Sequence, residues 1–324
     1  MPTITYREGL RQAMVEEMRR DERVFLMGED VSAYGGTYAV TKGLSEEFGE
    51  KRVRDTPIAE SVIVGSGVGA AINGLRPVAE LMTVNFSLLA LDQIVNHAAK
   101  LHHMFNGQMR VPMVIRTSAG WGQLAATHSQ TFENYFAYVP GLVVVAPSTP
   151  RDAKGLLKAS IRSDDPVVFL EHSLLYGVRG EVPDGDFVEE LGKSQVLRQG
   201  NDVTIVSWSR MANVSMVAAE WLAKDGIDAE VIDLRTLRPL DMEPVLESVR
   251  RTNRAVVAEE SWRSVGMGAE IAARIYEEAF DYLDAPVSRV AAIEVPVPYN
   301  RKLERTVFPQ EQNVVDAVRK LVKK

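Results

Sequence analysis

The sequence predicts an α/β protein of two domains, each a mostly parallel sheet flanked by helices. Short apolar segments typical of buried strands alternate with amphipathic segments typical of helices. The chain is long enough for two hydrophobic cores, since it has 324 residues of which 46% are hydrophobic. Between residues 176 and 202 the periodicity gives way to a stretch rich in Gly, Pro and Asp, which is typical of a linker.

The first domain is expected to cover residues 1–186 and to begin with a helix. Thr5 and Glu8 have capping-box spacing ahead of an amphipathic segment that should end near Asp21. A second helix is expected across 91–104. The predicted strands are apolar runs, and they cover Val24–Met27, Pro77–Thr83, Val111–Thr117, Gly141–Pro147 and Val167–Leu170.

A linker over residues 187–202 is expected to lead into the second domain, residues 203–324. Its strands are separated by helices of about 10 to 15 residues, which favours a parallel sheet with helices on both faces. The predicted strands are Val203–Ser207, Ala229–Leu234, Ala255–Glu259 and Val287–Ile293. The predicted helices are Asn213–Lys224, Glu243–Thr252, Gly268–Ala279 and Glu311–Lys323.

Composition excludes several classes of function. The net charge is −7 and no long Lys/Arg block occurs, so nucleic acid is not an expected partner. The absence of cysteine excludes disulfides, zinc-thiolate sites, iron-sulfur clusters and a thiol nucleophile. There is no apolar run of about 18 residues and the N-terminus is charged, which indicates neither a membrane span nor a signal peptide. We expect a cytoplasmic protein of a bacterium or archaeon, or the mature form of a mitochondrial-matrix or plastid protein.

A glycine-rich segment at 62–70 has two interpretations. Gly65, Gly67 and Ala70 fit the G-x-G-x-x-A dinucleotide fingerprint, with acidic Glu80 farther on, which would indicate an oxidoreductase that binds NAD or FAD. Against this, the apolar run before Gly65 is short and follows a charged turn. The alternative is a helix whose small side chains let it pack closely against another subunit or a cofactor.

Three residues are candidates for acid/base chemistry. Glu29 follows an apolar strand, and the binding and catalytic residues of α/β proteins commonly lie at the carboxyl ends of strands. Glu60 stands at a loop-to-helix junction, where it is either a proton-handling carboxylate in a partly dry pocket or a helix-start residue satisfied by first-turn amides. His128 lies among small and polar residues between predicted strands, and is suited to acid/base duty, to anion binding, or only to a solvated loop.

Six motifs, in the same order along the chain, resemble the beta subunits of thiamine-diphosphate-dependent 2-oxoacid dehydrogenases. The resemblance spans nearly the whole chain and implies a transketolase-type pyrimidine-binding domain followed by a transketolase C-terminal domain. The motifs are MGEDV at 27–31, RDTPIAE at 54–60, GLRP at 74–77, HSQ at 128–130, DAKGLLK at 152–158 and DLRTLRP at 233–239.

The resemblance also implies roles for single residues. Glu60 matches the glutamate that hydrogen-bonds the aminopyrimidine ring of thiamine diphosphate, Glu29 matches a second acidic residue near that ring, and Phe86 matches an aromatic residue packed against it. His128 matches a histidine on the substrate side that is implicated in reductive acylation of lipoamide. Family members also bind potassium through backbone carbonyls, which implies a K⁺ site at Ser160, Ile161, Ser163 and Asp165.

The expected partners follow from a motif that the sequence lacks. The family's Gly-Asp-Gly motif for diphosphate and Mg²⁺ does not occur, so that half of the site should come from an alpha subunit in an α2β2 heterotetramer. A dihydrolipoyl acyltransferase should dock on the assembly. The segments 82–87 and 175–178 resemble pyruvate-specific enzymes, with branched-chain 2-oxoacid and acetoin enzymes as alternatives. A non-catalytic scaffold subunit is a third hypothesis.

Overall fold

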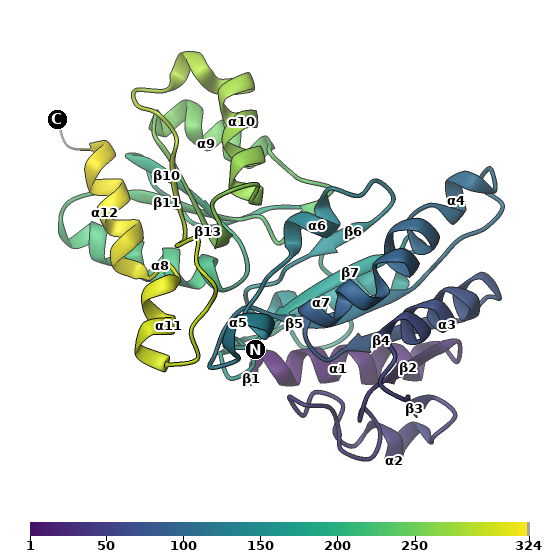
Figure 1. The fold of residues 1–324 in the computed structure, drawn as a ribbon. Helices are drawn as coiled ribbons and strands as arrows, with labels where there is room; N and C mark the ends of the chain where they lie inside the picture. Colours follow the sequence, from purple (N-terminus) through teal and green to yellow (C-terminus); the bar gives the residue numbers. More distant parts are fainter. Residues whose placement is uncertain (323–324) are drawn as a thin grey trace. The chain divides into compact units, whose positions relative to one another are not determined.

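A computed structural model describes residues 1–322 and divides the chain into two compact units (Figure 1). The first unit contains residues 1–119 and 135–191, and the second contains residues 120–134 and everything from Gly192 onwards. Each unit has its own mostly parallel sheet flanked by helices, which confirms the predicted fold class. Lys323, the last residue of the final predicted helix, lies outside the described residues.

Six strands of the first unit form a parallel sheet in the order β6-β7-β5-β4-β2-β3. Strands buried on both faces read as nearly continuous apolar runs, which is why the sequence revealed most of them. They are β2 (Val24–Gly28), β3 (Val53–Asp55), β4 (Arg76–Leu81), β5 (Val114–Ala119), β6 (Val143–Val145) and β7 (Val167–His172). Outside this sheet, β1 (Thr3–Thr5) pairs antiparallel with β8 (Arg179–Glu181).

The helices of the first unit include the predicted N-terminal one. The Thr5 hydroxyl accepts a hydrogen bond of 3.1 Å from the Glu8 amide, so that α1 (Tyr6–Arg20) begins with the expected cap. The side chains of α1 share a core with those of α7 (Pro150–Arg162). The helix expected across 91–104 is broken into two short ones. The remaining helices are α2 (Leu44–Phe48), α3 (Glu60–Ile72), η1 (Val84–Ala90), η2 (Gln93–Ala98) and α4 (Leu101–Met104).

The sheet of the second unit has the order β14-β13-β10-β11-β9, and only β9 is antiparallel to its neighbour. Figure 1 shows α9 and α10 on one face of this sheet and α8 and α12 on the other. Its strands are β9 (Gln195–Arg198), β10 (Val203–Ser207), β11 (Ala229–Asp233), β13 (Ala255–Trp262) and β14 (Ser288–Ala292), while the short strand β12 (Thr236–Arg238) is not part of this sheet. The helices are α8 (Ser209–Lys224), α9 (Glu243–Thr252), α10 (Met267–Ala279), η3 (Phe280–Tyr282), α11 (Arg301–Val307) and α12 (Glu311–Val322).

Two features of the second unit differ from the expected domain plan. The segment predicted as a linker contains β9, an edge strand of the second sheet. Residues 120–134, which the sequence assigned to the first domain, belong to the second unit. This segment carries α5 (Ala125–His128) and the start of α6 (Glu133–Ala137), and its Trp121 is buried in a cluster with Phe308.

Candidate active site

Two acidic residues from the sequence analysis lie at the carboxyl edge of the first sheet. Glu29 directly follows β2, and Glu60 opens α3 shortly after β3 ends. Gly28 pairs with Asp55, and the Thr56 amide donates a 2.9 Å hydrogen bond to the Gly28 carbonyl, so the two strand ends are fixed side by side. Ligands of open α/β sheets bind outside this edge. The fold therefore presents both carboxylates where a ligand would bind.

Glu60 is buried without a partner. It is 3% exposed, and among residues 1–322 no group donates a hydrogen bond to its carboxylate or forms an ion pair with it. The first-turn amides of Val62 and Ile63 donate to the Ala59 carbonyl at 2.9 Å, so they do not satisfy Glu60 as one interpretation of the sequence expected. The lone pairs of this carboxylate are therefore not used by hydrogen bonds within the described part of the chain. The position therefore suits a ligand that donates a hydrogen bond to Glu60.

The negative charge of Glu60 affects the pKa of Glu29. Burial raises the pKa of Glu29 above its usual value, and the charges of Glu60 and Asp30 raise it further. Repulsion between neighbouring carboxylates makes the charged form of Glu29 less favourable. The pair is therefore suited to hold or pass a proton beside a ligand.

Phe86 is the third predicted cofactor residue, and it comes from the next loop of the same edge. It is half-buried in η1, just beyond β4, and its amide donates a 3.0 Å hydrogen bond to the Thr83 carbonyl. Because β4, β2 and β3 are neighbours in the sheet, the loops that carry Phe86, Glu29 and Glu60 are neighbours too. The structure thus brings the predicted pyrimidine-contacting residues to one edge.

A buried charge network, which the sequence analysis did not identify, lies within this sheet. Arg116 on β5 is 2% exposed, and its guanidinium donates to both oxygens of Glu171 on β7, at 2.5 and 2.9 Å. It also pairs with Glu80 on β4, and the Tyr176 hydroxyl donates to Glu171 at 2.7 Å. Burial raises the pKa of Glu80, while Arg116 opposes that rise. Arg116 thus holds charged side chains of three adjacent strands together.

The residues implied for potassium lie at the opposite edge of the sheet. Ser160, Ile161, Ser163 and Asp165 stand at the end of α7 and before the first residue of β7, which is the amino edge. The Arg76 guanidinium donates to the carbonyls of Ile161 and Ser163, at 3.1 and 2.8 Å. A K⁺ bound by these oxygens would lie beside a fixed positive charge. The potassium site at these residues stays a prediction.

His128 lies in the second unit, at the end of the short helix α5. It is half-buried, and the Gln130 amide donates to its carbonyl at 3.0 Å. The neighbouring Ser129 is 1% exposed, and its hydroxyl donates to Glu304 of α11 at 3.4 Å. The histidine is therefore carried on a loop that the C-terminal part of the chain holds in place.

Glu133 is a buried carboxyl group close to that loop which the sequence analysis missed. It is 2% exposed, and its Oε2 is buried without a hydrogen-bond partner. Burial raises the pKa of Glu133 to about 7; a hydrogen bond with Thr131 opposes the rise, and the charges of Glu259 and Glu260 add to it. Such a residue carries no sequence signal, because its environment is assembled from distant segments.

This raised pKa predicts a loss of stability as the pH rises. The folded protein binds the Glu133 proton up to about pH 7, whereas the unfolded chain releases it near the ordinary value of 4.5, so folding is favoured at low pH and the advantage is lost as the pH approaches 7. From pH 5 to 8 the free energy of unfolding should fall by about 2 kcal/mol more in the wild type than in Glu133→Gln.

Urea unfolding followed by tryptophan fluorescence measures this difference, because all four tryptophans belong to the second unit. Glu270→Gln, which changes an exposed carboxylate of α10, is the matched control. If the free energy of unfolding changed with pH by the same amount in the wild type and in Glu133→Gln, the raised pKa of Glu133 would be contradicted.

The glycines of the apparent dinucleotide fingerprint do not form a phosphate loop. Gly65 and Gly67 lie in the middle of α3, where a fingerprint would need a turn between a strand and a helix. A Cβ on Gly67 would lie 2.9 Å from the Met113 side chain, and one on Gly65 would lie 3.0 Å from Gln93. These glycines allow close packing of α3, and Glu80 belongs to the Arg116 network. The interpretation as an NAD or FAD enzyme is wrong.

Residues 1–322 contain neither a cluster of potential metal ligands nor a helix that could span a membrane. No group of three or more His, Cys, Asp or Glu side chains in this range could hold a metal ion. Within the same range, no helix has the length and apolar character needed to cross a membrane.

Family models match both parts of the chain. Residues 2–178 match the transketolase pyrimidine-binding domain, and residues 192–314 match the transketolase C-terminal domain. A solved structure described as a split-gene transketolase, an inactive beta4 tetramer, covers 98% of this chain and 98% of its own with a TM-score of 0.81 and 26% identity.

Curated relatives are similar over almost the full chain. The pyruvate dehydrogenase E1 component subunit beta of Rhizobium meliloti is 50% identical over 98% of this chain and 70% of its own length. The subunit of the same name from Rickettsia bellii is 50% identical over 98% of both chains. The mitochondrial subunit from Caenorhabditis elegans is 50% identical over 98% of this chain and 92% of its own.

Proposed function

Because this chain belongs to the family of pyruvate dehydrogenase E1 component beta subunits, we propose that it works with an alpha subunit in the thiamine-diphosphate-dependent decarboxylation of pyruvate and the reductive acetylation of a lipoyl group. One observation carries the proposal. The carboxylate of Glu60 is buried, lacks a donor within residues 1–322, and lies at the carboxyl edge of the sheet beside Glu29.

The residues at this edge suit the pyrimidine half of the cofactor. Thiamine diphosphate, when bound, supplies the carbon nucleophile and the electron sink for decarboxylation. Glu60 would accept a hydrogen bond from the aminopyrimidine ring and hold the proton that its ring nitrogen exchanges. Glu29 would place a second carboxyl group near the ring, with a pKa that burial and the charge of Glu60 raise. Phe86 would pack against the ring and help to exclude water.

The remaining half of the site is proposed to come from the alpha subunit in an α2β2 heterotetramer. The sequence lacks a Gly-Asp-Gly motif, so the alpha subunit would bind the diphosphate and its Mg²⁺. The exposed face of α3, which includes Ser61, Val62 and Ser66, would form part of the subunit interface. A dihydrolipoyl acyltransferase would bind the assembly and present the lipoyl group.

The test is turnover by the assembled protein. The chain, co-purified with the alpha subunit encoded beside it, should decarboxylate pyruvate in preference to 3-methyl-2-oxobutanoate, should not cleave acetoin, and should turn over only with thiamine diphosphate and Mg²⁺ present. Preference for either of the other substrates would replace pyruvate in the proposal. Turnover without the cofactor would contradict it.

His128 is expected to act after decarboxylation, in acyl transfer. In the assembly, His128→Ala should lower the rate of lipoyl acetylation by about 100-fold, because a positioned acid/base group contributes at least that much. Decarboxylation measured with an artificial electron acceptor should stay within about twofold of the wild type. Stopped-flow and steady-state assays of the two reactions make the comparison, with His103→Ala on the exposed face of α4 as the control. Equal loss in both reactions would contradict a role confined to acyl transfer.

A further inference from the structure

We propose that Glu304 is a positioning residue that holds the His128 loop in the conformation needed for acyl transfer to the lipoyl group. The proposal rests on the role proposed above for His128 and adds a residue from the far end of the chain. Glu304 lies on α11, and its side chain is fully buried, with 0% exposure. A carboxylate in that position needs donors, and it finds them in one loop.

Within residues 1–322, all the hydrogen bonds that the Glu304 side chain accepts come from residues 122–129. The Gln123 amide donates to both carboxylate oxygens at 2.9 Å, and the Gly122 amide donates to Oε1 at 3.3 Å. The Ser129 hydroxyl donates to the same oxygen at 3.4 Å. One carboxylate therefore contacts both ends of the loop, and one of its partners is the residue next to His128.

The backbone of this loop needs such support. Gln123 and Ala125 have φ values of 60° and 63°, in the left-handed region that residues with a side chain rarely adopt. Residues stay in that region only where their surroundings hold them there. The strained Gln123 supplies the amide that both oxygens of Glu304 bind. Since Ala125 begins α5 and His128 ends it, the backbone conformation at Gln123 contributes to where His128 lies.

The loop also has anchors that do not involve Glu304. The ring of Trp121 stacks on Phe308 with 5.2 Å between centroids, and the Arg210 guanidinium lies 5.0 Å from the Trp121 ring centroid. The Gly120 amide donates to the Gln130 carbonyl at 2.8 Å and closes the base of the loop. Without Glu304 the segment should remain attached to the second unit. The backbone between Gly122 and Ser129 should no longer be held in a single conformation.

Two replacements of Glu304 in the assembled αβ protein test this role. Glu304→Leu removes every acceptor, and should lower kcat for lipoyl-domain acetylation by about 100-fold, as expected for a reacting group displaced by about 1 Å. Decarboxylation with an artificial electron acceptor should change by no more than about twofold. Glu304→Gln keeps one acceptor oxygen and should show an intermediate loss. Amide hydrogen exchange of residues 122–129 should be faster than in the wild type in both variants, and faster in Glu304→Leu than in Glu304→Gln.

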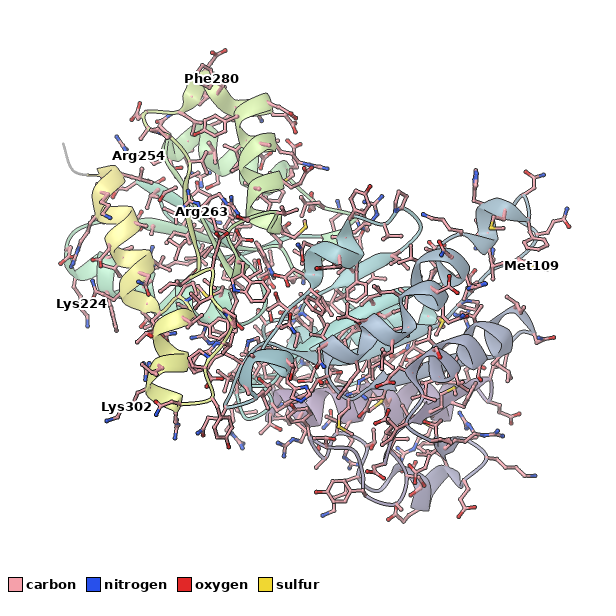
Figure 2. All side chains as sticks on the ribbon, viewed as in Figure 1. Met109, Lys224, Arg254, Arg263, Phe280 and Lys302 are labelled. Atoms are coloured by element: carbon pink, nitrogen blue, oxygen red, sulfur yellow. The ribbon has the colours of Figure 1, made fainter. Side chains whose placement is uncertain are left out.

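Two control variants separate positioning from general destabilisation. Val318→Ala opens a cavity in the core of the second unit, away from the loop, and should lower stability without changing the ratio of the two activities. Lys302→Ala changes an exposed side chain of α11 that points into solvent in Figure 2, and should have no effect.

The possible outcomes decide between the explanations. An activity ratio in Glu304→Leu that matches Val318→Ala, or unchanged exchange of the loop amides, would overturn the proposal. If the leucine variant does not assemble, the glutamine variant decides by the same two readouts. If His128→Ala leaves acetylation intact, the role proposed for His128 fails, while loop exchange still tests Glu304.

Discussion

Replacement of Glu60 by glutamine is expected to lower pyruvate decarboxylation in the assembled protein by about a thousandfold, within the range for a positioned proton-transfer group. Glutamine has nearly the same shape and can still accept a hydrogen bond, but it cannot hold the proton. Because the variant loses no hydrogen bond or ion pair of Glu60 within residues 1–322, it should unfold at about the same temperature as the wild type. Turnover assays and calorimetry on the same preparations measure both effects.

A matched control comes from another helix start. Glu243 opens α9 and is exposed, so Glu243→Gln removes a first-turn carboxylate without touching the site. It should affect stability by less than about 1 kcal/mol through the helix dipole and leave turnover intact. Thiamine-dependent turnover that survives in Glu60→Gln would remove Glu60 from the mechanism. A lowered unfolding temperature in that variant would point to a structural role.

Replacement of Arg116 by methionine is expected to destabilise the protein by about 3 to 5 kcal/mol, since it leaves two buried carboxylates without their cation. Arg116 donates to both oxygens of Glu171 and also pairs with Glu80, and these groups are buried or nearly so. Calorimetry should show the loss. The tryptophan signal, which comes only from the second unit, serves as an internal reference.

Combining Arg116→Met with Glu80→Gln and Glu171→Gln should recover a large part of the loss, because a neutral network no longer buries unpaired charge. The exposed pair of Arg274 and Glu270 provides the surface control, since Arg274→Met should change stability by no more than about 1 kcal/mol. A single variant as stable as the wild type, or a triple variant no better than the single, would show that charge pairing is not what Arg116 contributes.

Most of the fold was predictable because it depends on local signals. The Thr5 cap, the apolar runs of β2 and β10, and the alternation that defines β11, α9 and β13 are each encoded within a few residues. The antiparallel edge strand β9 was missed because its residues are only half-buried and lie in a stretch without clear periodicity. The 91–104 helix was expected to be continuous, but the structure divides it at Ala99 and Lys100.

The candidate site was predictable only in part. Glu29, Glu60 and Phe86 were identifiable because each follows a strand and stands in or near a family motif. Glu133 and Glu304 were not, since their significance comes from burial and from partners far along the chain, and Glu304 lies 182 residues from the Gly122 amide that it binds. The glycines of α3 suggested a dinucleotide site that the structure does not contain, because a spacing pattern does not distinguish a turn from the middle of a helix.

The assignment of residues 120–134 to the second unit has a consequence for how the protein is made. A ribosome synthesises this segment long before α11, so a nascent chain exposes Trp121 and the donors at Gly122 and Gln123 before Phe308 and Glu304 exist. The first unit can acquire its sheet during translation, but the His128 loop cannot mature until the C-terminal segment has left the exit tunnel. A truncated product that lacks α11 should therefore carry an intact carboxyl edge of the first sheet and an unformed His128 loop.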